Sequence, residues 1–226
     1  MTTTAIVTGA GTGFGLALTR ALADRGVAVV ACARDAVRLR SAVADLPGVH
    51  AVPGDVNDPA ARAAVLAAAG EGVDLLVHNA GELGPSPLPS LSAYPADALR
   101  AVLETTLLAP LQLTQLALPA LRAARGTVVT LSSDAAVEAY PGWGGYGAGK
   151  AALDQFAAVL GVEESDLAVY AFDPGDMRTA MHQRAFPGED ISDRPEPETA
   201  VPALLRLFDE RPPSGRFRAV DLAVPA

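Results

Sequence analysis

Short runs of apolar, often β-branched residues alternate with longer segments of helical periodicity along most of the chain. The apolar runs predict buried strands at residues 3–9, 27–33, 49–56, 73–81, 126–133 and 167–175, and a further strand at 216–224. The segments between them predict helices over 15–26, 35–46, 58–70, 94–125, 146–160 and 197–210. Strands that are apolar on both faces and separated by helices indicate a parallel sheet covered on both sides.

This order of elements predicts an α/β fold with a single Rossmann-type doubly wound parallel sheet of about seven strands. Residues 1–226 are expected to form one domain, because the chain has the length of one domain and contains no repeat or long linker. Ligands of such sheets bind at the carboxyl ends of the strands. Residues 179–197 are polar, contain three prolines and predict a loop over that edge.

The composition narrows the class of protein. Half of the 226 residues are hydrophobic and 19% are charged, which indicates a folded core rather than disorder. We expect no membrane span, no signal peptide and a cytoplasmic protein, and the sole cysteine, Cys32, excludes an internal disulfide or a multi-cysteine metal site. The histidines show no metal-ligand spacing. The net charge of −9 argues against nucleic acid as a partner.

A glycine-rich stretch, TGAGTGFG at residues 8–15, lies between the first predicted strand and the first predicted helix. Gly9 permits a tight turn, Gly13 lets the backbone approach a pyrophosphate, and Gly15 lets helix and strand pack closely. The helix N-terminus offers free N–H groups to phosphates. The stretch predicts a dinucleotide site, and the alternative is an ordinary turn.

A second stretch, GYGAGK at residues 145–150, contains the only lysine of the chain. Residues four apart on a helix share a face, so Lys150 is expected to lie beside Tyr146. A free tyrosine titrates near about 10, and a fixed cation favours its phenolate, which suits an acid/base group. Ser133, at the end of the fifth strand, is placed to polarise a carbonyl. The alternatives are a packing tyrosine, a surface lysine and a polar strand end.

These motifs together resemble the short-chain dehydrogenase/reductase family. The resemblance rests on TGxxxGxG at 8–15, GDV at 54–56, HNAG at 78–81, Ser133 with Tyr146-x-x-x-Lys150, and DPGDMRTAM at 173–181. It implies hydride transfer with Tyr146 as acid/base, Lys150 bound to ribose and tuning the tyrosine, and Ser133 on the carbonyl oxygen. The cofactor-binding residues that it implies are Gly9, Thr12, Gly13, Phe14, Gly15, Arg34, Asp55, Val56, Asn79, Ala80, Gly81, Tyr146, Lys150, Pro174, Gly175 and Thr179.

The choice of cofactor depends on the end of the second strand. By the resemblance, Ala33 occupies the position where NAD enzymes carry an acid, and Arg34 follows it. A guanidinium there suits the 2′-phosphate of NADP through charge-assisted hydrogen bonds, so we expect NADP(H), with NAD(H) as the alternative. Asp35 is expected either to pair with Arg34 or to approach the ribose. The alternative for Arg34 is a solvated side chain without a ligand contact. Asp55 is expected at the adenine, with a plain turn as its alternative.

The chain departs from the family at two positions. The family's catalytic Asn aligns with Thr106, whose hydroxyl on a helix often bonds the carbonyl four residues back, here that of Val102. His78 replaces the first Asn of NNAG and is expected to pack near the cofactor rather than act as an acid. The expected walls of the substrate pocket are Tyr140, Trp143 and Met181, and the alternative for Trp143 is that it only covers the glycine-containing loop beside it.

The sequence therefore predicts an NADP(H)-dependent oxidoreductase acting on a carbonyl or secondary alcohol of a small organic substrate. The rival is a cofactor-binding sensor or scaffold with little turnover, motivated by Thr106, His78 and the short tail at 214–226, which lacks the Gly-Gly that usually ends the family's last strand. The resemblance further implies a homodimer or homotetramer through the predicted helices 94–125 and 146–160. No residue identifies the substrate.

Overall fold

The computed structural model describes residues 3–222 and arranges them around one sheet in the order β3-β2-β1-β4-β5-β6-β7. Every pair of neighbouring strands is parallel, which confirms the predicted fold class. The strands are β1 (Thr4–Thr8), β2 (Ala28–Ala33), β3 (Val49–Pro53), β4 (Leu75–His78), β5 (Thr127–Leu131), β6 (Ala168–Asp173) and β7 (Gly215–Arg218).

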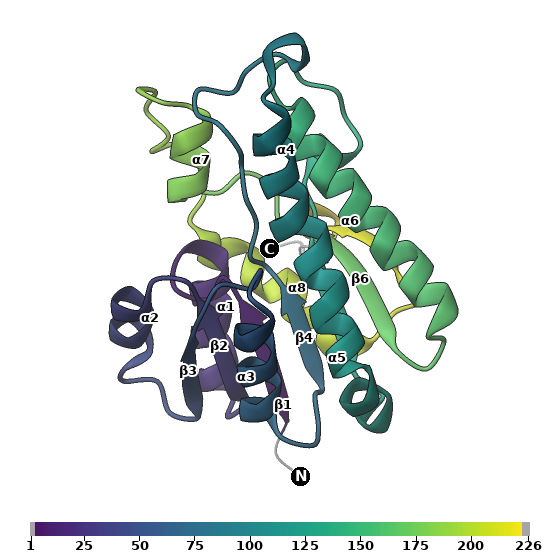
Figure 1. Cartoon of the computed structure of the whole chain (residues 1–226). Helices are drawn as coiled ribbons and strands as arrows, with labels where there is room; N and C mark the ends of the chain where they lie inside the picture. Colours follow the sequence, from purple (N-terminus) through teal and green to yellow (C-terminus); the bar gives the residue numbers. More distant parts are fainter. Residues whose placement is uncertain (1–2, 223–226) are drawn as a thin grey trace.

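Helices cover both faces of the sheet (Figure 1). They are α1 (Gly13–Asp24), α2 (Ala36–Val43), α3 (Pro59–Ala69), α4 (Ala96–Leu103), α5 (Ala109–Ala124), α6 (Gly144–Glu163), α7 (Ala180–Ala185), α8 (Val201–Glu210) and α9 (Ala219–Leu222). Helices α1, α2 and α8 pack on one face, and α3, α5 and α6 pack on the other.

Two hydrophobic cores result because successive side chains of a strand point to opposite faces. In β1, for example, Val7 belongs to the core under α1 and α8, whereas Ile6 belongs to the core under α3, α5 and α6. Cys32 is fully buried in the second core, as its position in an apolar strand predicts.

The predicted helix 94–125 is one helical segment with a change of winding in the middle. A π-helical turn, Glu104–Leu108, joins α4 to α5. By length and composition alone, Ala96–Ala124 would pass for a membrane span, contrary to the sequence expectation. Its buried face, which includes Leu113, Ala117 and Leu121, packs on the sheet like the core helix of a globular domain.

The predictions of a loop at residues 179–197 and of a strand at 216–224 were partly wrong. Residues 179–197 contain the short helix α7, because the Thr179 hydroxyl accepts from the His182 amide and caps it. The run at 216–224 is a strand only to Arg218. Helix α9 follows, where Asp221 pairs with Arg218 and Arg206 donates to the Leu222 carbonyl. Residues 223 and 224 lie outside the described residues.

Candidate active site

The glycine loop turns between β1 and α1 at the carboxyl edge of the sheet. Gly9 and Gly13 have φ angles of +67° and +53°, which L-residues with side chains rarely adopt. A Cβ on Gly9 would lie 2.6 Å from the Asn79 amide nitrogen, and one on Gly15 would clash with the same nitrogen and the Gly9 carbonyl. The glycine backbone is therefore closely packed on the side that faces Asn79, and its glycines place no side chain on the opposite side.

Asn79, just after β4, fixes this loop from beneath. Its side chain donates to the carbonyl oxygens of Thr8 at 2.9 Å and Gly9 at 3.1 Å, while the Thr8 hydroxyl accepts from the backbone amides of Asn79 and Ala80. The motif at 78–81 thus acts through hydrogen bonds that hold the glycine loop in shape.

The glycine loop opens onto a cavity of about 420 Å³. Its walls include most of the residues implied as cofactor-binding, namely Gly9, Thr12, Gly13, Phe14, Arg34, Asp55, Val56, Asn79, Ala80, Gly81, Tyr146, Lys150, Pro174 and Thr179. Gly15 packs under the loop instead, and Gly175 lines the neighbouring cavity. The bare backbone at the helix N-terminus and the flanking cations fit an anionic dinucleotide.

The structure narrows the alternatives left open at the cavity's outer end. Asp35 caps α2 by accepting from the Arg38 amide at 2.9 Å and forms no ion pair with Arg34, but it lines the cavity, so its approach to the ribose stays a prediction. Arg34 approaches Glu82 at 3.8 Å and is largely exposed. Arg38 and Arg184 also line the cavity, and the sequence reasoning missed both.

Asp55 combines two of its expected roles. Its carboxylate accepts from the Asn57 amide at 2.9 Å, as a turn residue does, and it also lines the cavity.

The three residues expected to be catalytic converge at the edge of this cavity. On α6, the Lys150 Nζ lies 5.5 Å from the centre of the Tyr146 ring and donates to the Leu131 carbonyl at 2.5 Å. Ser133, after β5, accepts from the Ala135 amide and donates to Asp134 at 2.8 Å. One helical turn therefore brings the lysine and the tyrosine together, as their spacing predicts.

The pKa values differ from the simple expectation that Lys150 lowers that of Tyr146. Burial raises the pKa of the Tyr146 phenol, Asp173, Asp134 and Asp176 raise it further, and a hydrogen bond with Ser133 opposes them. Burial also lowers the pKa of Lys150 to about 8, against the opposing effect of Asp154 and Asp173. In the absence of ligand, the phenol is held protonated.

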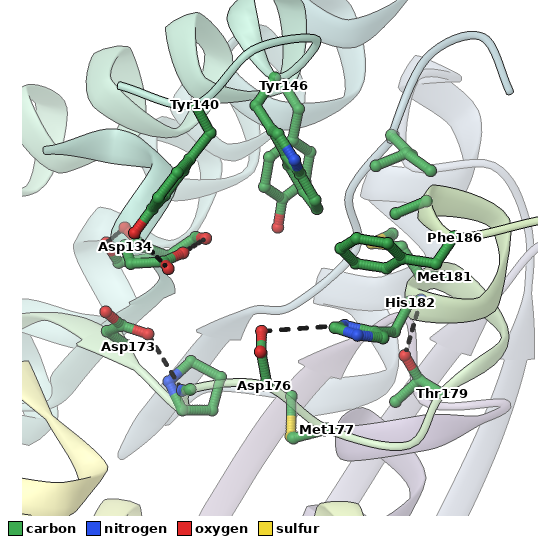
Figure 2. A pocket seen from close by; sticks show the side chains of 17 residues that line it. Asp134, Tyr140, Tyr146, Asp173, Asp176, Met177, Thr179, Met181, His182 and Phe186 are labelled. Atoms are coloured by element: carbon green, nitrogen blue, oxygen red, sulfur yellow. Dashed lines mark hydrogen bonds and ion pairs between the residues drawn. The ribbon is translucent and has the colours of Figure 1, made fainter. Parts of the chain in front are cut away.

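A second cavity, of about 350 Å³, adjoins the first, and Tyr146 lines both. Figure 2 shows the Tyr146 hydroxyl pointing into it from α6, with Met181 and His182 of α7 and Phe186, which directly follows α7, opposite. Its wall also includes Ser133, Tyr140 and Trp143.

A charged network behind Ser133 was not foreseen. Arg216 on β7 contacts Asp173 at 2.9 Å and Asp154 at 3.1 Å, and it donates to the Ser133 carbonyl at 3.0 Å. The Ser132 hydroxyl donates to Asp154 at 2.7 Å. In the sequence, only the position of Asp154, four residues after Lys150 on the same helix, pointed to a charged partner at this place.

Thr106 lies buried in the π-helical turn, where its side chain packs next to Gly149 of α6. Its hydroxyl makes no hydrogen bond, so the expected bond to the Val102 carbonyl was wrong. The π-helical winding displaces the carbonyl that an α-helix would offer four residues back.

His78 is buried on the α5 side of the sheet and lines neither cavity, although the next residue, Asn79, lines the glycine-loop cavity, and its expected packing near the cofactor stays a prediction. Its Nε2 lies 2.8 Å from the Thr114 hydroxyl on α5. Burial lowers the pKa of its imidazole to about 3.

Comparisons with known proteins agree with this geometry. The chain is 36% identical to serine 3-dehydrogenase of Agrobacterium fabrum over 165 residues, which are 71% of this chain and 65% of that protein. It therefore spans less than two thirds of that relative. It is 33% identical to L-xylulose reductase of Bos taurus over 224 residues, 97% of this chain and 85% of that one.

Two similar solved structures contain nicotinamide cofactors. A short chain dehydrogenase of Shigella flexneri complexed with NADP is 28% identical with a TM-score of 0.86, covering 96% of this chain and 97% of that chain. One of Escherichia coli CFT073 complexed with NADPH is 29% identical with a TM-score of 0.85, covering 96% of each chain. Residues 3–190 match the short chain dehydrogenase family, and the chain therefore belongs to that family.

Proposed function

We propose that the protein is an NADP(H)-dependent oxidoreductase of one catalytic domain, which transfers a hydride between nicotinamide and a carbonyl or secondary alcohol. The observation that carries this proposal is the position of Tyr146. It lies one helical turn from Lys150 and lines both the glycine-loop cavity and the second cavity. A group shared by two adjoining cavities is placed to act between a cofactor in one and a substrate in the other.

The residues divide the chemistry among them. The bound nicotinamide supplies or accepts the hydride. Tyr146, held protonated by burial, donates its proton to the carbonyl oxygen during reduction and accepts it during oxidation. The Ser133 hydroxyl turns from Asp134 to the same oxygen and stabilises its developing charge. Lys150 binds ribose hydroxyls and offsets the negative charge when the phenol loses its proton.

Cations support the preference for NADP(H). Arg34, Arg38 and Arg184 line the glycine-loop cavity and offer guanidinium groups to a 2′-phosphate. Arg34 and Arg184 both approach Glu82, at 3.8 and 3.4 Å, and a phosphate would compete with this carboxylate for them. The cofactors of the two solved relatives agree with this choice.

The test is NADPH oxidation with a panel of ketones and aldehydes, and NADP⁺ reduction with alcohols. We expect turnover by the wild-type protein, and at least a hundredfold loss in Tyr146→Phe with nearly unchanged NADPH affinity, because only the ionisable hydroxyl is removed. NADPH binding without turnover on a broad panel would favour the sensor instead.

We further propose that copies of the chain associate through α5 and α6. Leu116 on α5 and Val162 on α6 are apolar yet 44% and 81% exposed. Sedimentation velocity of the wild type and of Val162→Glu tests this association, and a wild-type monomer at micromolar concentration would rule it out.

A further inference from the structure

The two cavities carry opposite charge. Three carboxylates line the second cavity, those of Asp134, Asp173 and Asp176, and no lysine or arginine is among its lining residues, all of which lie in the described part of the chain. The arginines and Lys150 line the glycine-loop cavity instead. An anionic substrate would therefore meet like charges beside Tyr146.

Among the three carboxylates, Asp134 has no cationic partner in the described residues and Asp176 has only a long ion pair. Asp173 pairs with Arg216 at 2.9 Å, but Asp134 accepts only from hydroxyl and amide groups and forms no ion pair within residues 3–222. The nearest cation to Asp176 is the Arg194 side chain at 3.6 Å, beyond hydrogen-bond distance.

Tyr140 shows how little compensation is present at the mouth of the cavity. Its hydroxyl lies 3.1 Å from Asp134 and 2.7 Å from Glu138, and one hydroxyl proton serves two carboxylates. The excess negative charge also acts on Tyr146. Burial raises the pKa of its phenol, and Asp173, Asp134 and Asp176 raise it further.

Aromatic rings form another part of the wall. Trp143 lies edge-on to Tyr146 with ring centres 5.6 Å apart and packs on Phe186 at 5.9 Å. Aromatic faces beside carboxylates stabilise an ammonium group better than a neutral group of the same shape.

His182 supplies an independent sign of a missing ligand. Its side chain is 9% exposed, its Nδ1 lies 3.8 Å from Asp176, and its Nε2 is buried without a hydrogen-bond partner. Figure 2 shows the ring reaching from α7 toward Asp176 along the cavity wall. A buried ring nitrogen without a partner is costly unless a bound molecule completes its hydrogen bonding.

We propose that the substrate of this site is a carbonyl compound or alcohol that bears a cationic amine, which binds between Asp134, Asp176 and the aromatic wall. This inference rests on the proposed function, since Tyr146 must act on the carbonyl while the carboxylates hold the cation.

The test compares three methyl ketones of nearly equal shape. One carries a dimethylammonium group three methylenes from the carbonyl, the second an isopropyl group in its place, and the third a hydroxylated chain without charge. Affinity for the protein–NADP⁺ complex is measured by calorimetry, and kcat/KM is measured with NADPH. We expect the cationic ketone to exceed both neutral ketones at least about tenfold at low salt, and the preference to shrink as salt screens the charges.

Two variants test which carboxylates produce the preference for the cationic ketone. Asp176→Asn and Asp134→Asn should each reduce the ratio of cationic to isopropyl ketone about fivefold or more, with NADPH affinity retained as the sign of an intact fold. Glu189→Gln, a carboxylate of the same chain segment that does not line the cavity, should leave the ratio unchanged. Equal or better binding of either neutral ketone, or a ratio unaffected in both aspartate variants, overturns the inference.

The two proposals fail in different ways. Preferential binding of the cationic ketone without turnover of any ketone would uphold the cation site and reject the enzyme. Turnover of neutral ketones without a cationic preference would uphold the enzyme and reject the cation site.

Discussion

The Arg216 guanidinium joins Asp173 at 2.9 Å and the Ser133 carbonyl at 3.0 Å through one nitrogen, and thereby links the ends of three neighbouring elements. Its Nε contacts Asp154 of α6. The edge strand β7 is therefore tied directly to the segment that carries the proposed carbonyl-binding serine.

Replacing Arg216 by Ala should reduce both stability and turnover. The change leaves two partly buried carboxylates without their cation, which we expect to cost about 2–3 kcal/mol in the free energy of unfolding, less than for a fully buried pair because Arg216 is partly exposed. Urea unfolding measures this. The matched control is Arg100→Ala, which removes an exposed pair with Asp97 and should cost under about 1 kcal/mol. Equal costs for the two variants would contradict the linking role.

Lys150→Arg should lose at least a hundredfold in kcat although the charge is kept. The ammonium is buried and donates to the Leu131 carbonyl at 2.5 Å, and a planar, forked guanidinium cannot reproduce the geometry of a compact ammonium. Steady-state NADPH oxidation measures the loss, with circular dichroism as the check of folding. A near-wild-type rate would show that positive charge alone is sufficient.

Arg34→Ala should weaken NADPH much more than NADH. One charge-assisted contact to a phosphate contributes roughly 1.5–3 kcal/mol, and the exposure of Arg34 places the expected loss at the lower end. Fluorescence titration of both cofactors measures the difference. Arg25→Ala is the control, since Arg25 pairs with Asp209 and does not line the cavity. Equal weakening of both cofactors would mean that Arg34 does not contact the 2′-phosphate.

Thr106→Ala should cost less than about tenfold in rate, or about 1.4 kcal/mol, because the hydroxyl makes no bond that the substitution would break. Thr106→Asn should match or exceed the wild-type rate, since it restores the residue that the family resemblance implies. Both variants are compared on one accepted carbonyl. A hundredfold loss in Thr106→Ala with unchanged cofactor affinity would make the threonine itself catalytic.

His78 should make the protein less stable in mild acid. Burial lowers its folded pKa to about 3, whereas the unfolded chain has a value near about 6.5 and so binds more protons between these limits. Stability contributed by the neutral ring is therefore full above about pH 6.5 and falls with decreasing pH, by about 1.4 kcal/mol per unit at most. Urea unfolding across this range should show a shallower pH slope in His78→Gln. An identical slope would assign the acid sensitivity to other groups.

The sheet and the chemistry at its edge could be predicted because each depends on local patterns. Apolar runs with intervening periodic segments determine a parallel sheet. The spacing of Tyr146 and Lys150 places them together because a helix has a fixed geometry. Glycines at residues 9 and 13 permit the positive φ angles that the turn between strand and helix requires.

The remaining features depend on contacts between distant parts of the chain. Arg216 meets Asp173 and Asp154 only after β6, β7 and α6 are assembled. The π-helical turn that leaves the Thr106 hydroxyl unpaired and the cap that turns residues 180–185 into a helix are likewise tertiary outcomes. Desolvation also outweighs the expected effect of Lys150 on Tyr146, and no sequence pattern reports how deeply a ring is buried.

All seven strands run parallel, so their carboxyl ends lie along one rim of the sheet and their amino ends along the other. The two rims therefore tolerate sequence changes differently. The glycine loop and the proposed catalytic residues follow strand ends or begin the helices after them. In the part of the chain that the structure describes, the opposite rim holds reversals such as those at Gly26, Gly48 and Gly70, whose φ angles are positive. Substitutions and insertions there act through folding alone, which makes that rim the natural place to attach a label or a fused domain while the chemistry is studied undisturbed.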